Sequence, residues 1–226
     1  MTHCTTAKQI ALIFGGADPV KHTVIKQKID VLMENEACEK TIICADHGLA
    51  LADKLAIKPH IVTGDFDSVC PDLLARYKQI DGVSIRHNED QNSTDLSKAI
   101  ALAPDTAEEI HIYGAWGGRP DHLIGNLLGF LNHPRRHQLV FHDENSIIRL
   151  LDRDHHFHGT QGDYVGIFPI QHIRNLRYDG LKYTPDMLDG VHELGWIGAC
   201  NVLVAEKAAI YIDSGLAIFT HTTVSE

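Results

Sequence analysis

The chain has 226 residues, of which 44% are hydrophobic and 22% charged, a composition typical of a soluble globular protein with one large or two small domains. Its formal net charge of −10 argues against a broad surface for nucleic acid or anionic membrane. No apolar run approaches the roughly 20 residues of a membrane-spanning helix, and the apolar segment Ile10–Phe14 is too short for a signal peptide. We therefore expect a cytoplasmic protein.

Short apolar, strand-like runs alternate with helical patterns over residues 1–143. The helical patterns cover Gly48–Ala56, Leu96–Ala103 and Pro120–Leu131, the last with a proline suited to the first helical position. The expected strands are Ile10–Phe14, Thr41–Ala45, His60–Thr63, Val83–Arg86, Glu109–Tyr113 and Gln138–Phe141. This alternation predicts a three-layer α/β/α (Rossmann-like) domain with a parallel sheet, which binds ligands at the carboxyl ends of its strands.

Residues 144–226 have a different pattern, with strand-like runs separated by glycines and no convincing helix. The expected strands are Ile147–Leu150, Tyr164–Pro169, Leu181–Tyr183, Asn201–Ala205, Ala208–Ile212 and Leu216–Thr220. We expect a smaller all-β sandwich or partial barrel, which would pack on the first domain or on a second subunit because it buries little apolar surface alone.

The cysteines and histidines do not indicate a metal or redox site. The five cysteines are scattered without knuckle or redox spacing, so we expect reduced thiols. His155, His156 and His158 have no accompanying cysteine or carboxylate pattern, so we expect a solvated turn there rather than a zinc site.

Carboxylates follow several expected strands. Asp46 ends the second strand, and Asp65 and Asp67 follow the third, where Gly64 lets the chain turn. In an extended backbone the i, i+2 spacing of Asp65 and Asp67 would put both side chains on one side. Carboxylates gathered at one sheet edge repel one another and favour Mg²⁺ with phosphate. Taken singly, however, the Asp65–Asp67 segment is equally consistent with an acidic turn, and Asp46 with a helix cap.

The loop Asp90–Asp95 precedes the helix Leu96–Ala103 at the same sheet edge. Asp95 lies in its first turn, with Ser93 or Thr94 as the expected cap, and an isolated acid there would serve the helix dipole. Its position beside the other carboxylates favours a place in the same metal site. Gln91 in this loop could equally be a solvated amide.

A glycine-rich segment, Gly114–His122, follows the fifth strand and opens the helix that starts at Pro120. Glycines let a backbone approach phosphate, and Arg119 offers a charged fork. The segment lacks the P-loop and dinucleotide fingerprints, so an ordinary loop between strand and helix is about equally consistent with it.

Four motifs together resemble those of thiamine pyrophosphokinases, in the same order and similar spacing over nearly the whole chain. They are Asp46-His47-Gly48, Gly64–Ser68, Asp90–Asp95 and Gly117–His122. The resemblance implies an ATP-dependent thiamine diphosphokinase (EC 2.7.6.2), which transfers the pyrophosphoryl group of ATP to the hydroxyl of thiamine and releases AMP. It also implies Mg²⁺ as cofactor and a homodimer with thiamine between the α/β domain of one subunit and the β domain of the other.

The resemblance assigns roles to individual residues. The magnesium and phosphate centre would be formed by Asp46, Asp65, Asp67 and Asp95, with Asp67 and Asp95 as candidates for orienting or deprotonating the hydroxyl. Nucleotide and phosphate contacts would come from Asp46, Gly48, Gly64, Gly117, Gly118, Arg119 and Asp121. Thiamine contacts would come from Gln91, Thr94, Cys200 and Asn201.

The chain departs from the family pattern in the second domain. Many members have Ser-Asn-Glu where this chain reads Cys200-Asn201-Val202, and a thiol is a weaker hydrogen-bond partner than a hydroxyl. Two alternatives therefore stay open. One is a pyrophosphokinase for another small heterocyclic alcohol, such as a pterin, and the other is a non-catalytic nucleotide or thiamine sensor.

Overall fold

The computed structural model describes residues 8–18, 21–90, 92–116, 120–187, 192–196 and 198–224. The chain forms two compact units. The first comprises residues 1–132 and 138–144, and the second comprises residues 133–137 and 145–226. Short 3₁₀ turns lie at Arg136–Gln138 and Pro185–Met187.

The first unit contains a parallel sheet whose strand order reverses in the middle. Its strands are β1 (Lys8–Phe14), β2 (Cys38–Ala45), β3 (Ile61–Gly64), β4 (Ser84–His87), β5 (Ala107–Tyr113) and β6 (Leu139–His142). Their order is β6-β5-β1-β2-β3-β4, with parallel pairing throughout. The chain runs outward from β1 to β4 and then continues on the other side of β1 with β5. The carboxyl ends of β1 and β5 therefore flank a switch point, where such sheets bind ligands.

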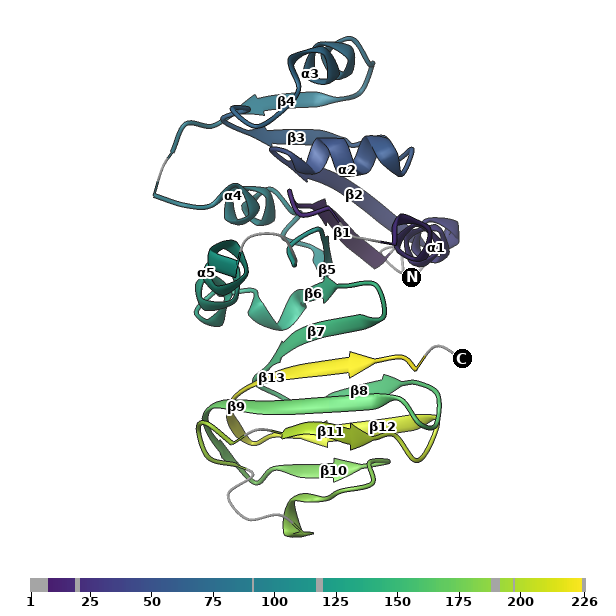
Figure 1. The fold of residues 1–226 in the computed structure, drawn as a ribbon, viewed down its shortest axis with the longest axis vertical. Coiled ribbons are helices and arrows are strands. Elements are labelled where there is room, and N and C mark those ends of the chain that lie inside the picture. The colour runs from purple at the N-terminus through teal and green to yellow at the C-terminus, as the bar shows by residue number, and fades with distance from the viewer. Residues whose placement is uncertain are drawn as a thin grey trace, which may run out of the picture. The chain divides into compact units, whose positions relative to one another are not determined.

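Helices cover both faces of this sheet. They are α1 (His22–Glu34), α2 (Gly48–Lys54), α3 (Pro71–Lys78), α4 (Asp95–Ala101) and α5 (Pro120–Leu131). Figure 1 shows α1 and α2 on one side of the strands and α4 and α5 on the other. In the described parts of the chain, no helix is long and apolar enough to span a membrane.

The apolar run of β1 explains its central place, because a strand covered on both faces cannot alternate polar and apolar residues. Residues 10–14 are all buried. On one face they join a cluster that includes Ile25 and Ile29 of α1, Leu49 of α2 and Tyr77 of α3. This packing fixes the strand ends on which the candidate site is built.

The helix α5 has the expected bounds but not the expected burial. Leu123, Ile124, Leu127, Leu128 and Leu131 follow a helical spacing, yet Ile124 and Leu128 are 57% and 59% exposed. The buried side chain of α5 is that of Phe130. The spacing thus predicts the helix but not which of its apolar residues the sheet covers.

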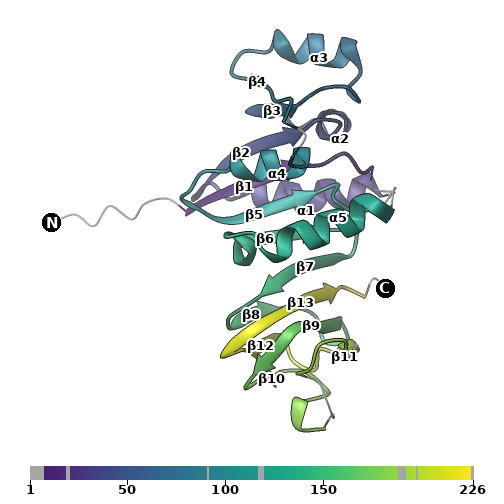
Figure 2. The same cartoon turned by 90° about the vertical axis from the view of Figure 1, so that its left-hand side faces the viewer.

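The second unit is built from antiparallel strands. They are β7 (Ser146–Leu151), β8 (His155–His158), β9 (Tyr164–Arg174), β10 (Arg177–Asp179), β11 (Gly198–Val202), β12 (Lys207–Tyr211) and β13 (Ser214–Thr222). Within this unit they pair as β11-β9-β13-β7 and as β10-β12-β8. Figure 2 shows the long strands β9 and β13 side by side. Both sets of strands share one hydrophobic core, which includes Val165 and Phe219 from the first set and Phe157 and Ile210 from the second.

Two local expectations for this unit are wrong. His155–His158 is a strand paired with β12 rather than a turn, because Phe157 between the histidines is buried in the core while His156 and His158 are exposed. Leu181–Tyr183 is not a strand: it has one isolated bridge, between Leu181 and Leu203. The mixed α/β class, with a parallel sheet and separate antiparallel strands, is confirmed.

Four of the five cysteines lie in the described part of the chain. Cys38 and Cys44 are buried, Cys70 and Cys200 are exposed, and all four are free. Cys4 lies outside the described residues.

A buried carboxylate fastens the last strand of the second unit. Asp163 precedes β9 and is 2% exposed. It accepts hydrogen bonds from the amides of Thr160 (2.9 Å) and Val224 (3.2 Å) and pairs with His221 Nε2 (2.8 Å). Burial alone would raise the pKa of Asp163, but these donors together hold it below its usual value.

We expect Asp163→Asn to lower the stability by about 2 kcal/mol, because the amide cannot satisfy all of these buried donors. Thermal and urea unfolding would measure the loss. Since the folded pKa of Asp163 is depressed, its contribution is present above the unfolded pKa and disappears as the pH falls through the folded value. Exposed Asp186 provides the control Asp186→Asn, and an equal effect of both substitutions at neutral pH would contradict the assignment.

Candidate active site

Two glycine loops close the sheet at the switch point. The amide of Gly15, after β1, donates to Tyr113 O (2.7 Å), and the amide of Ala17 donates to Gly114 O (2.9 Å), after β5. A Cβ on Gly15 would lie 2.6 Å from Gly114 O, and one on Gly114 would lie 2.6 Å from Gly15 O. Gly114 also has φ +67°. The two loops can pack this closely only because both positions are glycine.

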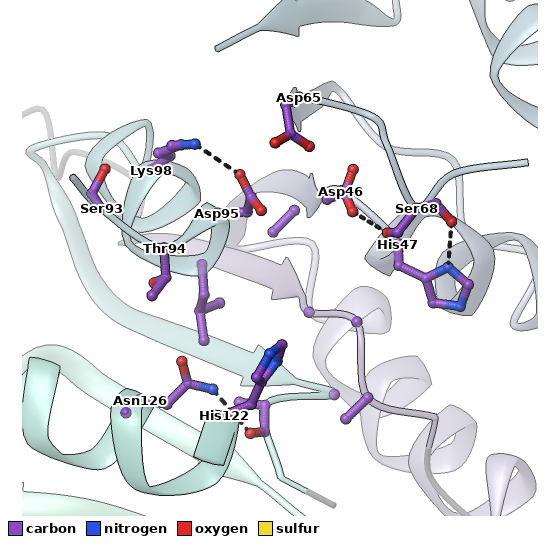
Figure 3. A pocket seen from close by; sticks show the side chains of 18 of the residues that line it. Asp46, His47, Asp65, Ser68, Ser93, Thr94, Asp95, Lys98, His122 and Asn126 are labelled. Carbon is purple, nitrogen blue, oxygen red and sulfur yellow. Dashed lines mark hydrogen bonds and ion pairs between the residues drawn. The ribbon is translucent and has the colours of Figure 1, made fainter. Parts of the chain in front are cut away.

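Beside these loops, three carboxylates converge from three segments. Asp46 follows β2, Asp65 follows β3, and Asp95 begins α4. One carboxylate oxygen from each lies within 4.8 Å of the others. Figure 3 shows the three side chains turned toward a common space. Parallel strands thus bring together acids that are distant in the sequence, as their positions at strand ends predicted.

Asp46 is the most buried member of this group, 8% exposed, and its backbone has φ 45°. Its Oδ2 accepts a hydrogen bond from the hydroxyl of Ser68. Its Oδ1 is buried without a hydrogen-bond partner in the described part of the chain. A buried carboxylate oxygen in that position is costly unless a cation or donor satisfies it.

Lys98 supplies a positive charge to the group. Its Nζ lies 3.0 Å from Asp95 Oδ1 and donates to the carbonyl of Asn88 at 3.3 Å. The lysine side chain is only 5% exposed. Of the two expected caps of α4, Ser93 and Thr94, the structure shows Thr94, whose hydroxyl accepts a hydrogen bond from the amide of Ser97. The cap and the ion pair together fix the direction of Asp95.

Asp67 lies at the edge of the group. The backbone is not extended between Asp65 and Asp67, because Phe66 adopts φ 64°, so the argument from i, i+2 spacing does not apply. The amide of Asp67 donates to Asp65 Oδ1 at 3.3 Å. Repulsion by Asp65, with smaller contributions from partial desolvation and from Asp46 and Asp95, raises the pKa of Asp67. The charge of Asp67 is therefore repelled by all three carboxylates.

The converging carboxylates and Lys98 face a cavity of about 650 Å³ in the first unit, and Asp67 is not among the residues that line it. Its lining includes both glycine loops, the carboxylates Asp46, Asp65 and Asp95, and Thr94 and Lys98. The start of α5 contributes Asp121, His122 and Asn126, and Asn126 Nδ2 donates to Ala115 O at 3.2 Å. The volume is within the usual range for small-molecule sites.

Asp18 also lines the cavity, but its carboxylate already has two hydrogen-bond partners. Lys54 and His22 each approach its carboxylate at 2.5 Å. Hydrogen bonds from Lys54 and then His22 lower the pKa of Asp18. Its charge is therefore already compensated, unlike that of the Asp46 oxygen.

Two of the predicted phosphate-binding glycines have packing roles. A Cβ on Gly48 would lie 1.9 Å from Phe14 O, so this glycine seats α2 against the end of β1. A Cβ on Gly64 would lie 3.0 Å from Asp46 Cβ, so Gly64 leaves room for the buried carboxylate. Gln91, Gly117, Gly118 and Arg119 lie outside the described residues.

Asn201 and Cys200, the predicted thiamine contacts of the second unit, lie in β11. Asn201 is 8% exposed. Its Oδ1 accepts a hydrogen bond from the N–H of Tyr183 (3.0 Å), and its Nδ2 donates to the C=O of the same residue (2.7 Å). The asparagine thus holds the segment around Tyr183 against β11. Cys200 is exposed and has φ 63°.

Several residues that line the cavity have no role that the sequence predicts. Gly15 and Gly16 carry no prediction, although glycines directly after a first strand are typical of a ligand-binding loop. Lys98 lies three residues after Asp95, and this i, i+3 spacing on one helix could have predicted the ion pair. His47, Ser68 and His122 lie within the motifs of the resemblance but had no role predicted, and Asn126 gave no signal.

The carboxylates fit a hard divalent cation. All potential ligands of the group are oxygens, as Mg²⁺ prefers, and Asp46 Oδ1 is an acceptor without a donor among the described residues. A site with three carboxylates and one lysine has a net negative charge. A polyanion such as a nucleoside triphosphate would therefore bind there only together with a cation. The arrangement can therefore bind a metal–phosphate complex.

Comparison with known proteins identifies one family. Residues 33–141 match the family profile "Thiamin pyrophosphokinase, catalytic domain". Thiamine pyrophosphokinase 1 of Arabidopsis thaliana is 31% identical over 183 residues, which cover 74% of this chain and 67% of that protein. Thiamine pyrophosphokinase 1 of Oryza sativa subsp. japonica is 27% identical, over 72% of this chain and 66% of that protein. The chain thus spans about two thirds of the length of these plant relatives.

Solved structures share the fold. The thiamine pyrophosphokinase of Bacillus subtilis has a TM-score of 0.77 at 21% identity, covering 96% of this chain and all of that one. The yeast thiamin pyrophosphokinase has a TM-score of 0.69 at 16% identity, covering 96% and 87%.

We expect Asp67→Asn to raise the melting temperature of the metal-free protein at neutral pH, by about 2 °C. The raised pKa of Asp67 means that its charged form is unfavourable in the folded state, so removing the charge relieves repulsion. Thermal unfolding in EDTA measures the shift. Asp72→Asn, at an exposed acid in the first turn of α3, is the control and should give no rise. A lower melting temperature for Asp67→Asn would refute the repulsion.

Proposed function

Because the chain belongs to the thiamine pyrophosphokinase family, we propose that it transfers the pyrophosphoryl group of ATP to the hydroxyl of thiamine, giving thiamine diphosphate and AMP (EC 2.7.6.2). The observation that carries the proposal is the convergence of Asp46, Asp65 and Asp95 with Lys98 in a cavity at the switch point of the sheet. This is the chemistry that a metal–triphosphate complex needs.

The proposal extends to the architecture of the working enzyme. The first unit would be the ATP- and Mg²⁺-binding α/β/α domain, and the second would be a β sandwich that takes part in binding thiamine. We propose a cytoplasmic homodimer in which these two functions come from different subunits, as the resemblance implies.

The cation would be held by Asp46 through its free Oδ1, together with Asp65 and Asp95. Bound there, Mg²⁺ would neutralise phosphate charge and align the reacting oxygens. The protein itself keeps the three carboxylates in place before ligands arrive. The Ser68 hydroxyl holds one oxygen of Asp46, and Lys98 holds one oxygen of Asp95. Such preorganisation avoids reorganisation cost during the reaction.

Lys98 would have a second task. Its ammonium group is buried at the cavity wall, where a positive charge interacts with phosphate more strongly than it would in water. The N-terminal turn of α5 lines the same cavity and would add favourable dipoles toward an anion. Together they would position the triphosphate for in-line attack by the alcohol.

Asp67 and Asp95 are the proposed carboxylates for orienting or deprotonating the thiamine hydroxyl. Asp95 is held by Lys98, which suits a fixed positioning role. In the second unit, which would bind thiamine, the side-chain amide of Asn201 is hydrogen-bonded to the backbone of Tyr183. We therefore propose that Asn201 shapes the thiamine surface by holding that segment, while exposed Cys200 contacts the ligand.

The proposed reaction predicts that purified protein incubated with ATP, Mg²⁺ and thiamine yields AMP and thiamine diphosphate in equal amounts. Asp65→Asn should lower kcat at least about 100-fold, because it removes one carboxylate from the metal group. Asp105→Asn, at an exposed acid away from the cavity, is the matched control. Chromatographic separation of the products measures both variants.

The same assay decides between the alternatives. Absence of AMP and thiamine diphosphate, under conditions in which a known family enzyme works, would refute the proposal. Formation of AMP only with a different heterocyclic alcohol would keep the transfer and change the acceptor. Nucleotide binding without turnover of any acceptor would favour a sensor.

A second prediction concerns Lys98. Lys98→Gln should lower kcat by about 100-fold, since it removes a buried cation from the wall of the cavity in which we propose that the triphosphate binds. The control is Lys58→Gln, because Lys58 also donates to a backbone carbonyl, that of Asp81, but on the surface. Steady-state kinetics at saturating Mg²⁺ measure both. A kcat within about twofold of the unchanged protein would exclude a role for Lys98 in the reaction.

A further inference from the structure

The second unit contains a cluster of metal-ligand side chains that the proposed reaction does not use. His172 lies in β9, and His192 and Glu193 lie in the segment 192–196. One ligand atom from each lies within 4.8 Å of the others. We propose that these three side chains form a binding site for a divalent transition metal, Zn²⁺ in particular.

The distances within the cluster fit such an ion. Glu193 Oε1 lies 3.1 Å from His172 Nδ1 and 3.4 Å from His192 Nε2. Ligand atoms at Zn–N and Zn–O distances of about 2.0–2.2 Å, arranged tetrahedrally, stand about 3.3–3.6 Å apart. Two of the three ligand pairs thus already stand close to the separation that a bound ion requires, and the two histidine nitrogens lie within 4.8 Å of each other. Water can take the fourth position.

Backbone contacts hold the two segments together independently of a metal. The amide of Ile173 donates to His192 O at 2.9 Å, which joins the residue after His172 to the second histidine. The amide of Trp196 donates to Glu193 O at 3.2 Å, and the Trp196 side chain packs on the hydrophobic core of the second unit. The ligands are therefore presented by anchored backbone on both sides.

The ligand types select the metal. Two imidazoles and one carboxylate suit Zn²⁺ and its transition-metal neighbours, whereas Mg²⁺ prefers oxygen ligands such as the carboxylates of the first unit. Without a metal, the same side chains are exposed and form ion pairs only when a histidine is protonated. Exposed pairs of this kind contribute little to stability. A bound ion would instead cross-link β9 to the segment that leads toward β11.

The test is a Zn²⁺ titration of the full chain by calorimetry, in excess Mg²⁺ so that the carboxylate group is occupied. We expect one Zn²⁺ site per chain that is at least tenfold weaker in His192→Ala and in Glu193→Gln, since losing even an indirect partner of a ligand costs about 10–100-fold. The control is His156→Ala, which removes an exposed histidine of β8 and should leave binding unchanged. These side chains are exposed, so the variants should fold.

A second readout distinguishes this site from other histidines on the surface. Zn²⁺ should slow amide hydrogen exchange in residues 192–196, and His172→Ala should abolish that protection. Tetrahedral Co²⁺ absorption should follow the same pattern across the variants. Equal Zn²⁺ affinity in His192→Ala and the unchanged protein, or the absence of a stoichiometric site, would overturn the proposal. Because binding and exchange are measured without substrates, the result does not depend on the transfer reaction.

Discussion

Repulsion between like charges at one edge of the parallel sheet is the constraint on which the candidate site depends. Two unit charges about 5 Å apart, at an effective dielectric constant of about 20, repel by about 3 kcal/mol. The total free energy of unfolding of a protein is about 5–15 kcal/mol, so carboxylates with such repulsion stay together only where the surrounding structure is rigid. The buried β1, packed between helices on both faces, provides that rigidity. The fold brings Asp46, Asp65 and Asp95 together at this edge, and the cation proposed above would neutralise their charge.

The local structure around the carboxylates serves the same end. Asp46 and Phe66 have left-handed backbone conformations, which residues other than glycine rarely adopt. Asp46 is one of the carboxylates of the site, and Phe66 lies between Asp65 and Asp67. Gly64 leaves space for Asp46, and Gly48 lets α2 begin against β1. These features favour geometry over local backbone energy, a pattern expected where binding requires preformed ligands.

The sequence predicts the elements with strong periodicity and the acids at strand ends. The bounds of α5 and the apolar run of β1 follow directly from residue spacing, and placing the acids at one edge needs only the rule for parallel sheets. What the sequence does not predict depends on contacts between distant segments. The hydrogen bonds between Asn201 and Tyr183 join residues 18 positions apart. In β8, the polar histidines on either side of Phe157 gave no indication that its side chain is buried. Burial on α5 likewise depends on which of its side chains face neighbouring elements. Helical spacing carries no such information, and Ile124 and Leu128 remain exposed.

The interlocked glycines after β1 and β5 have a consequence beyond the floor of the cavity. Each occupies the space that a methyl group on the other would need, so the two positions act as a single steric unit. A larger residue at either would push apart the two halves of the sheet at the point where its strand order reverses. A substitution at one of these glycines is therefore expected to displace both loops together, and with them the two halves of the sheet that they join.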